Sequence, residues 1–272
     1  MIPKKIHYCW LSGEEFPDKV KKCMQTWKDI MPDYEFILWD MDRFDINSAD
    51  FVKEAVNVKK WAFASDYIRL HALYTEGGIY LDTDVIVKKS FDGFLEHDFF
   101  SAIEFFPYIG NKNFIDLYDD GTVMQRISGY ALQSAIFGSV AGHPFLKDCL
   151  NFYKDRHFIL PDGSFADKII SPDICATIAQ KYGFRYKNEE QNLAHGMIIF
   201  PSSILASNVW GFTKNSFAIH CAVGGWRSKS FWGKLITNNT LVRKLVKRPP
   251  VIKDEYEFVQ NSPVWQECKE EK

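Results

Sequence analysis

The sequence predicts an α/β fold in which a mostly parallel central sheet is flanked by helices. Segments typical of strands and of helices follow one another over the first 90 residues, the pattern that builds parallel sheets. Of the 272 residues, 46% are apolar and 25% are charged, which is typical of a globular domain with a large core. No linker rich in Pro, Gly or Ser divides the chain, so we expect a single domain over residues 1–272.

The first half of the chain gives the clearest elements. We expect three strands and three helices there, namely strands 5–10, 34–39 and 79–87 and helices 18–30, 48–58 and 61–74. Pro17 and Pro32 bracket the first helix, and Ser48 is the candidate N-cap of the second. Gly77-Gly78 ends the third helix and turns the chain into the last of these strands.

The second half is less regular and is expected to supply loops and a cover for the sheet. Residue type and spacing predict strands 99–105, 131–137, 197–200 and 216–221 and helices 144–153 and 172–182. Ligands of open α/β sheets bind at the carboxyl ends of the strands, so we expect the functional site there.

Charge and cysteine patterns exclude several classes of protein. A net charge of −2 gives no overall field for nucleic acid, and no apolar run reaches the roughly 18 residues of a membrane span. The first residues lack the apolar segment of a signal peptide, and the six cysteines form no C-x-x-C pair. These features predict a cytoplasmic protein with reduced thiols.

Residues 227–272 are predicted to form a basic and aromatic C-terminal extension. Between Arg227 and Arg248 there are seven Lys or Arg residues and no Asp or Glu, interleaved with Phe231 and Trp232. This composition fits a helix that contacts an anionic membrane from its inner face, and an ordinary solvated helix is the alternative.

Asp82-Thr83-Asp84 interrupts an apolar strand with two carboxylates. Residues i and i+2 of a strand point to the same face, so these side chains are expected to converge on one hard cation such as Mg²⁺ or Mn²⁺. Without a cation or a donor the two carboxylates would repel each other. A second D-x-D sequence, Asp40-Met41-Asp42, follows Trp39 in a polar stretch and is predicted to form a turn.

Asp66 and Arg69 lie one turn apart on the third predicted helix and share a face of it. An ordinary surface ion pair is the alternative, but the apolar neighbours Phe63, Tyr67 and Leu70 favour partial burial. A carboxylate and a guanidinium held together in a pocket suit sugar hydroxyls or a phosphate.

Together these motifs resemble glycosyltransferase family 32, the DXD-containing sugar transferases, and more distantly the glucosylating domains of the large clostridial toxins. The resemblance lies in Ser65-Asp66-x-x-Arg69 followed by Gly77-Gly78-x-Tyr80-x-Asp82-x-Asp84. It extends to residues 2–10, to residues 32–35 with Trp39, and to residues 218–220 with Trp226. The chain departs from the family pattern at Cys221 after His220, at Gly224-Gly225 before Trp226, and at Ser171-Pro172.

The resemblance implies a GT-A fold, a nucleotide-sugar donor and a divalent cation, usually Mn²⁺, with Mg²⁺ as the alternative. It places Asp84 as a direct metal ligand, Asp82 at the metal and the ribose, and His220 at the metal or the diphosphate. It places Trp10 near the nucleobase. The residues that it places at the donor sugar are Ser65, Asp66, Arg69 and Tyr80. Asp66, Arg69, Asp82 and Asp84 are thereby the candidate catalytic residues. A buried strand histidine is the alternative for His220, and core packing is the alternative for Trp10.

The predicted activity is transfer of a hexose from a UDP-sugar, galactose or glucose ahead of mannose, to a saccharide acceptor such as a capsule or lipopolysaccharide unit. Retention of configuration is implied by the resemblance, and Glu104 is a candidate for acceptor contact. Two alternatives stay open: a phosphoryl-transfer enzyme or nucleotide-sugar hydrolase using the same carboxylates, and a non-catalytic nucleotide-sugar-binding protein. A Rossmann dehydrogenase is disfavoured because no G-x-G-x-x-G follows the first strand.

Overall fold

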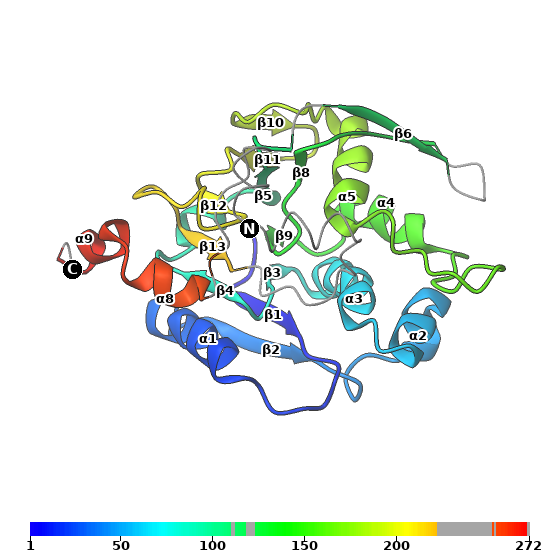
Figure 1. Cartoon of the computed structure of the whole chain (residues 1–272), viewed down its shortest axis with the longest axis horizontal. Helices are drawn as coiled ribbons and strands as arrows, with labels where there is room; N and C mark the ends of the chain where they lie inside the picture. Colours follow the sequence, from blue (N-terminus) through cyan, green and yellow to red (C-terminus); the bar gives the residue numbers. More distant parts are fainter. Residues whose placement is uncertain (110–111, 118–122, 222–251, 253, 271–272) are drawn as a thin grey trace, which may run out of the picture.

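A computed structural model of the chain describes residues 1–109, 112–117, 123–221, 252 and 254–270 (Figure 1). Its centre is an eight-stranded sheet in the order β10-β11-β5-β9-β3-β1-β2, with β8 paired to β5. The strands are β1 (Lys5–Cys9), β2 (Glu35–Trp39), β3 (Gly78–Leu81), β5 (Phe99–Phe105), β8 (Tyr130–Leu132), β9 (Ile136–Ser139), β10 (Gln191–Leu193) and β11 (Met197–Phe200). The predicted α/β class is confirmed.

The sheet is mixed. Its parallel strands β1, β2 and β3 come from the first half of the chain, where the sequence predicts the elements most clearly. β1 is parallel to both β2 and β3, and β11 is parallel to β5. β9 runs antiparallel to both of its neighbours, β3 and β5. β8 and β9 follow one another along β5 and are both antiparallel to it, because the chain returns from β5 with no crossover helix among the described residues.

Three helices precede β3, as expected: α1 (Asp18–Ile30), α2 (Asp50–Asn57) and α3 (Trp61–Glu76). The expectation for Ser48 is wrong, because Ala49 stands at the N-cap of α2. Ser48 instead ends a 3₁₀ turn, Ile46–Ser48, in which its hydroxyl donates to the Asp45 carbonyl oxygen. Asp45 caps that turn by accepting from the Asn47 N–H, so the capping side chain lies three residues earlier than predicted.

The predicted strand 79–87 is two strands in two sheets. β3 ends at Leu81, and β4 (Val85–Val87) joins a three-stranded sheet with β13 (Ala218–His220) and β12 (Leu205–Ala206). Asp82 to Asp84 form the turn between them, closed by the Val85 N–H donating to the Asp82 carbonyl oxygen at 3.0 Å. The two carboxylates therefore converge through a turn and not through the pleat of one strand.

The second half follows the prediction in its helices and in strands β5 and β11, whose bounds are those predicted, and departs from it in its other strands. α4 (Pro144–Tyr153) is confirmed, and α5 (Ser171–Ala179) continues into a 3₁₀ turn, Gln180–Tyr182. The predicted strand 131–137 is divided into β8 and β9, since the Gln133 side chain accepts the Ala135 N–H between them. The hairpin of β6 (Asn113–Leu117) and β7 (Val123–Ile127) was not predicted.

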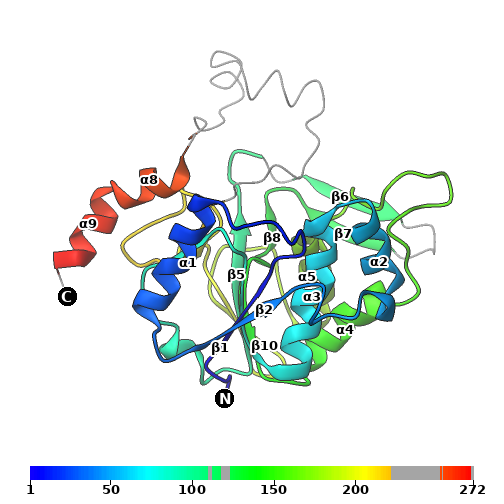
Figure 2. The ribbon, with the colours of Figure 1, turned by 90° about the horizontal axis from the view of Figure 1, so that it is seen from below.

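Apolar side chains pack on both faces of the central sheet. Figure 2 shows α1 on one face and α3 with α4 on the other. One core cluster joins the sheet to α2, α3, α4 and α5, and a second joins it to α1 through Trp27 and Met31. Sequence periodicity on these helices thus corresponds to buried faces.

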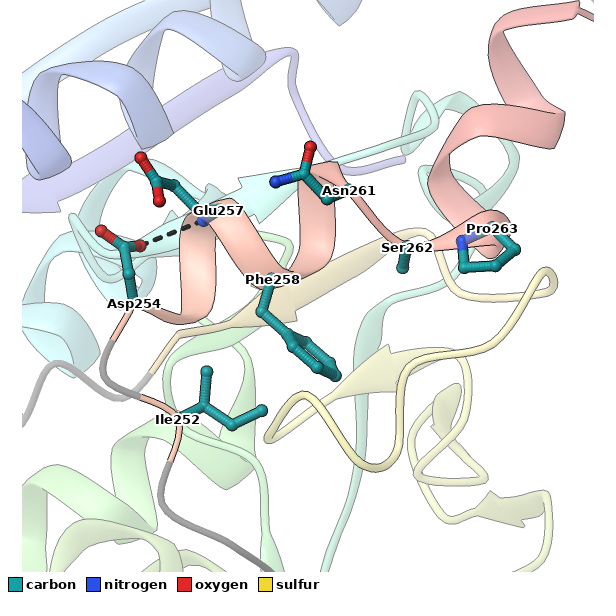
Figure 3. Close-up of a pocket in the computed structure, with 7 residues that line it drawn as sticks. All are labelled: Ile252, Asp254, Glu257, Phe258, Asn261, Ser262 and Pro263. Carbon is teal, nitrogen blue, oxygen red and sulfur yellow. Dashed lines mark hydrogen bonds between the residues drawn. The ribbon is translucent and has the colours of Figure 1, made fainter.

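A third and smaller cluster attaches the last described helices, α8 (Glu255–Gln260) and α9 (Pro263–Glu270), to the small sheet. Val259 and Trp265 pack there against Ile219 and Cys221. A hollow of about 490 Å³ runs along α8 and the start of α9 (Figure 3). The basic segment 227–248 lies outside the described residues. Within the described part of the chain, no helix has the length and apolar character needed to cross a membrane.

Candidate active site

Asp82, Asp84 and His220 come together although they lie far apart in the sequence. β13 runs antiparallel to β4 with His220 opposite Val85, and the Cys221 N–H donates to the Asp84 carbonyl oxygen at 3.0 Å. This pairing places the His220 ring beside the Asp82–Asp84 turn. One ligand atom from each of the three side chains lies within 4.8 Å of the others.

The three side chains are a donor set that fits a divalent cation. His220 Nε2 lies 3.2 Å from Asp84 Oδ1 and 4.0 Å from Asp82 Oδ2. Their side chains are 18 to 24% exposed, so the cluster is half-buried and open to solvent on one side. Two carboxylate oxygens suit Mg²⁺ or Mn²⁺, and the imidazole nitrogen favours Mn²⁺ of the two.

The carboxylates also set the charge of His220. Burial lowers its pKa, but the charge of Asp84, the hydrogen bond to Asp84 and the charge of Asp82 outweigh burial and raise the pKa to about 9. Glu104, partly buried on β5, adds a smaller effect in the same direction. Because a metal ligand must be the neutral imidazole, a cation held at this site would displace the proton of His220.

Arg69 joins the helix α3 to the Asp82–Asp84 turn. Its guanidinium Nη2 lies 3.1 Å from Asp66 Oδ1 and 3.3 Å from Asp82 Oδ1, and its side chain is 5% exposed. Nη1 donates to the Ser134 carbonyl oxygen at 2.7 Å. The ion pair of Asp66 and Arg69 is therefore a buried one, as the apolar neighbours predicted, and it extends to the first carboxylate of the D-x-D sequence.

Tyr80 and Ser65 lie behind these charged groups. The Tyr80 hydroxyl donates to Asp82 Oδ1 at 2.9 Å, and the Arg69 guanidinium lies 4.7 Å from the centre of its ring. Ser65 Oγ accepts from Arg69 Nη2 at 3.0 Å and donates to the Ala62 carbonyl oxygen. Tyr80 is 1% exposed, so its described contacts orient Asp82 and Arg69.

Gly77-Gly78 brings α3 back against the sheet, as predicted, and the backbone of this turn requires glycine at both positions. Gly77 has φ +66° and Gly78 has φ +118°, and a Cβ on Gly78 would lie 2.9 Å from His7 Nε2. His7 Nδ1 accepts from Trp39 Nε1–H at 2.9 Å, so its Nε2–H donates to the Gly77 carbonyl oxygen at 2.8 Å. His7 is thus a buried support of this turn, a role that the sequence analysis missed.

Trp10 lies at the same edge of the sheet, one residue past the carboxyl end of β1. β1 is parallel to β3 with His7 opposite Tyr80, so Trp10 and the Asp82–Asp84 turn follow neighbouring strand ends. Its ring is partly buried, packs on Phe16 at 4.8 Å between centroids and donates from Nε1 to the Glu14 carbonyl oxygen.

The second D-x-D sequence is a turn, as predicted. Asp40 Oδ1 accepts the N–H groups of Asp42 and Arg43 at 3.1 and 3.0 Å. The Asp40 carboxylate accepts hydrogen bonds from the backbone of its own turn, whereas Asp82 and Asp84 face side chains from other elements.

The sequence analysis missed one further residue beside the site, Ser134. Its carbonyl oxygen accepts a hydrogen bond from Arg69 Nη1 at 2.7 Å. The position has no local signal, because Ser134 lies in an ordinary polar link.

Residues 17–101 match a family model described as the glycosyltransferase sugar-binding region containing the DXD motif. This range holds Asp66, Arg69, Asp82 and Asp84, the same four residues that the structure brings together. Residues 17–101 are thus similar to the sugar-binding region of the DXD-containing glycosyltransferases. The predicted resemblance is confirmed, and the matched region supplies the hydrogen-bond and ion-pair partners of Arg69 apart from Ser134.

Two fungal relatives are similar to part of this sequence. Inositol phosphoceramide mannosyltransferase 3 of Schizosaccharomyces pombe is 27% identical over 53% of this chain and 35% of its own length. Mannosyl phosphorylinositol ceramide synthase SUR1 of Saccharomyces cerevisiae is 27% identical over 59% of this chain and 37% of its own length. The chain thus spans about a third of the length of these curated relatives.

A solved structure of the galactosyltransferase LgtC with donor and acceptor sugar analogues also superposes on this chain. The sequences are 13% identical, and the superposition covers 93% of this chain and 99% of LgtC with a TM-score of 0.43.

Proposed function

We propose that this glycosyltransferase transfers a hexose from a nucleoside diphosphate sugar to a saccharide acceptor with the help of a divalent cation. The observation that carries the proposal is the cluster of Asp82, Asp84 and His220, with ligand atoms within 4.8 Å, inside and beside the matched DXD region. The fold it requires is of the GT-A type in a single domain. The family match favours transfer over the hydrolase and binding-protein alternatives.

The chain's own residues divide the work in this proposal. Asp82, Asp84 and neutral His220 hold the cation, which is Mn²⁺ or Mg²⁺ and stabilises the charge on the leaving diphosphate when bound. Arg69 fixes Asp82 from behind and neutralises part of the carboxylate charge. Asp66, next to Arg69 and 14% exposed, is the carboxylate placed to accept hydroxyl groups of the donor sugar.

The donor is proposed to be UDP-galactose or UDP-glucose, with Trp10 at the nucleobase. The position of Trp10 at the strand edge that carries the Asp82–Asp84 turn supports this assignment. One fungal relative is named a mannosyltransferase and the other a mannosyl phosphorylinositol ceramide synthase, so GDP-mannose is the competing donor that a test has to include.

The acceptor is proposed to be a saccharide of the capsule or lipopolysaccharide kind, free or lipid-linked, and the reaction to retain configuration. The names of both fungal relatives include a ceramide lipid, which supports a lipid-linked acceptor. The described cysteines are free and buried, as expected in a reducing cytoplasm. The seven basic residues between Arg227 and Arg248 would then serve contact with an anionic membrane. Absence of pelleting with anionic vesicles at low salt would contradict this contact.

A donor panel tests the proposal. UDP-galactose, UDP-glucose and GDP-mannose are each incubated with the protein and Mn²⁺, and nucleotide release is measured with and without EDTA. We expect slow release from a UDP-hexose that EDTA abolishes. Release from GDP-mannose alone would correct the donor, and neither release nor nucleotide binding with any donor would contradict the proposed function.

A further inference from the structure

Two aromatic rings, those of Phe105 and Tyr130, form a pair at one edge of the central sheet. Phe105 ends β5, Tyr130 begins β8, and the two residues stand directly opposite each other in the antiparallel pairing of these strands. Their ring centroids are 4.7 Å apart, and both rings pack on the core cluster that joins the sheet to α3. Neither residue is fully buried, so the pair presents aromatic surface to solvent.

This edge is the one that carries the Asp82–Asp84 turn. β9 lies between β3 and β5 (Figure 1) and runs antiparallel to both, so β3 and β5 run in the same direction and end at the same edge. The Asp82 N–H donates to the Ala135 carbonyl oxygen at 2.9 Å, and the preceding Ser134 carbonyl oxygen accepts from Arg69 Nη1 at 2.7 Å. The link that begins after β8 therefore connects the ring pair to the candidate active site.

The ring pair also lies on the face of the sheet that carries Arg69. Side chains alternate between the two faces of a strand, so Phe105 shares a face with Ile103, which is buried in the core cluster beside α3. Tyr80 belongs to the same cluster, and the Arg69 guanidinium lies 4.7 Å from the centre of its ring. The exposed aromatic surface is thus continuous in edge and face with the proposed donor-sugar site.

Further aromatic residues extend this surface. Phe106 and Tyr108 follow β5 directly, are partly exposed, and have ring centroids 5.9 Å apart. The faces of a sugar ring carry C–H groups, which pack on the electron-rich face of an aromatic ring, while the sugar hydroxyls keep hydrogen bonds to water or polar side chains. The four side chains are all aromatic and two carry a hydroxyl group, which suits a saccharide better than a lipid chain.

We propose that Phe105 and Tyr130 form the acceptor subsite, where a sugar ring of the saccharide acceptor stacks on the exposed ring pair. This inference rests on the proposed function, in which the acceptor is a saccharide, and it adds the place where that saccharide binds. The acceptor then lies on the face shared with Arg69, beside the donor sugar.

The test measures saccharide binding with UDP and Mn²⁺ present. Saturation-transfer nuclear magnetic resonance gives the dissociation constants of lactose, maltose and mannobiose for wild type, for Phe105→Leu, which removes the aromatic face, and for Phe105→Tyr, which keeps it. We expect wild type to bind at least one of these disaccharides. Phe105→Leu should weaken that binding about tenfold, the scale of one lost aromatic contact, and Phe105→Tyr should bind nearly as well as wild type.

Phe258→Leu is the matched control. Phe258 lies on α8, is 43% exposed and also pairs with an aromatic ring, that of Trp210, at 5.8 Å between centroids. This variant should bind the disaccharide as wild type does. Equal losses in Phe105→Leu and Phe258→Leu, or in Phe105→Leu and Phe105→Tyr, would overturn the inference.

The outcomes separate this inference from the proposed function. Wild-type protein that neither releases nucleotide from any donor nor binds UDP contradicts the proposed function and this inference with it. Wild-type protein that releases nucleotide but binds none of the three disaccharides contradicts the acceptor subsite alone. Undiminished disaccharide binding by Phe105→Leu contradicts it in the same way.

Discussion

Asp82 and Asp84 are separated by one residue, yet the groups that surround them differ in kind. Asp82 meets the Arg69 guanidinium at 3.3 Å and the Tyr80 hydroxyl at 2.9 Å. Asp84 meets the His220 ring at 3.2 Å. Arg69 carries a permanent charge, whereas His220 loses its proton when a cation binds.

This difference separates a fixed side of the site from an exchanging side. The fixed side consists of Asp66, Arg69, Tyr80 and Asp82, all drawn from α3, β3 and the turn that follows. The exchanging side consists of Asp84 and His220, drawn from two distant parts of the chain. We infer that the fixed side maintains the geometry of the site and that the exchanging side determines its affinity for the cation.

The largest expected effect is on the exchanging side. Asp84→Asn should lower Mn²⁺-dependent nucleotide release more than about 100-fold, the scale of losing a group that stabilises transition-state charge. Asp40→Asn changes the first residue of the other D-x-D sequence and is the matched control. Equal loss in both variants would contradict the distinction between the two sequences.

On the fixed side the expected effect is on stability. Arg69→Met leaves Asp66 and Asp82 without their buried partner and should lower the free energy of unfolding by about 3 kcal/mol. Arg43→Met removes an exposed partner of Glu76 and should cost less than about 1 kcal/mol. Urea unfolding measures both, and a similar small cost in the two variants would show that Arg69 is not a structural centre.

A smaller effect is expected from Tyr80→Phe. The change removes one hydrogen bond to Asp82 and keeps the buried ring, so it should cost about 1 to 2 kcal/mol of unfolding free energy. Because Asp82 keeps Arg69, Mn²⁺ affinity should fall much less than in Asp84→Asn. Calorimetric Mn²⁺ titration of the two variants compares them, and equal loss would place Tyr80 on the exchanging side.

The smallest effect concerns His7, the support of the Gly77-Gly78 turn. Burial lowers the pKa of His7, and this outweighs the raising effects of the Gly77 hydrogen bond and the Glu76 charge. The unfolded chain therefore binds the proton more readily, so this contribution to stability is complete above about pH 6.5 and is lost as pH falls below it. His7→Gln should be less stable than wild type at pH 7.5, and its unfolding free energy should fall less between pH 7 and 5. An unchanged pH dependence would contradict the described role of His7.

The sequence predicted the fixed side because its parts are local. Asp66 and Arg69 share a helix face, and one glycine turn joins that helix to the strand before Asp82, so spacing alone relates them. Spacing did not predict the backbone at Asp82 and Asp84 correctly. Residues 79–87 have a continuous apolar pattern on either side of these carboxylates, and such a pattern does not indicate that its two halves belong to different sheets. The sequence analysis predicted correctly that the two carboxylates converge, but it was wrong in placing both of them on one strand.

The exchanging side could be predicted only in part. His220 was found only through the resemblance. Its place beside the Asp82–Asp84 turn comes from the pairing of β13 with β4, which puts His220 opposite Val85, and no local sequence pattern indicates that pairing.

The most direct test of the central claim is to locate the ion itself. Crystals grown with Mn²⁺ and UDP, measured at a wavelength where manganese scatters anomalously, should show one strong peak between Asp82, Asp84 and His220. Crystals of Asp84→Asn grown in the same way should lack it. A manganese peak elsewhere in the molecule, with none at these three residues, would contradict the account.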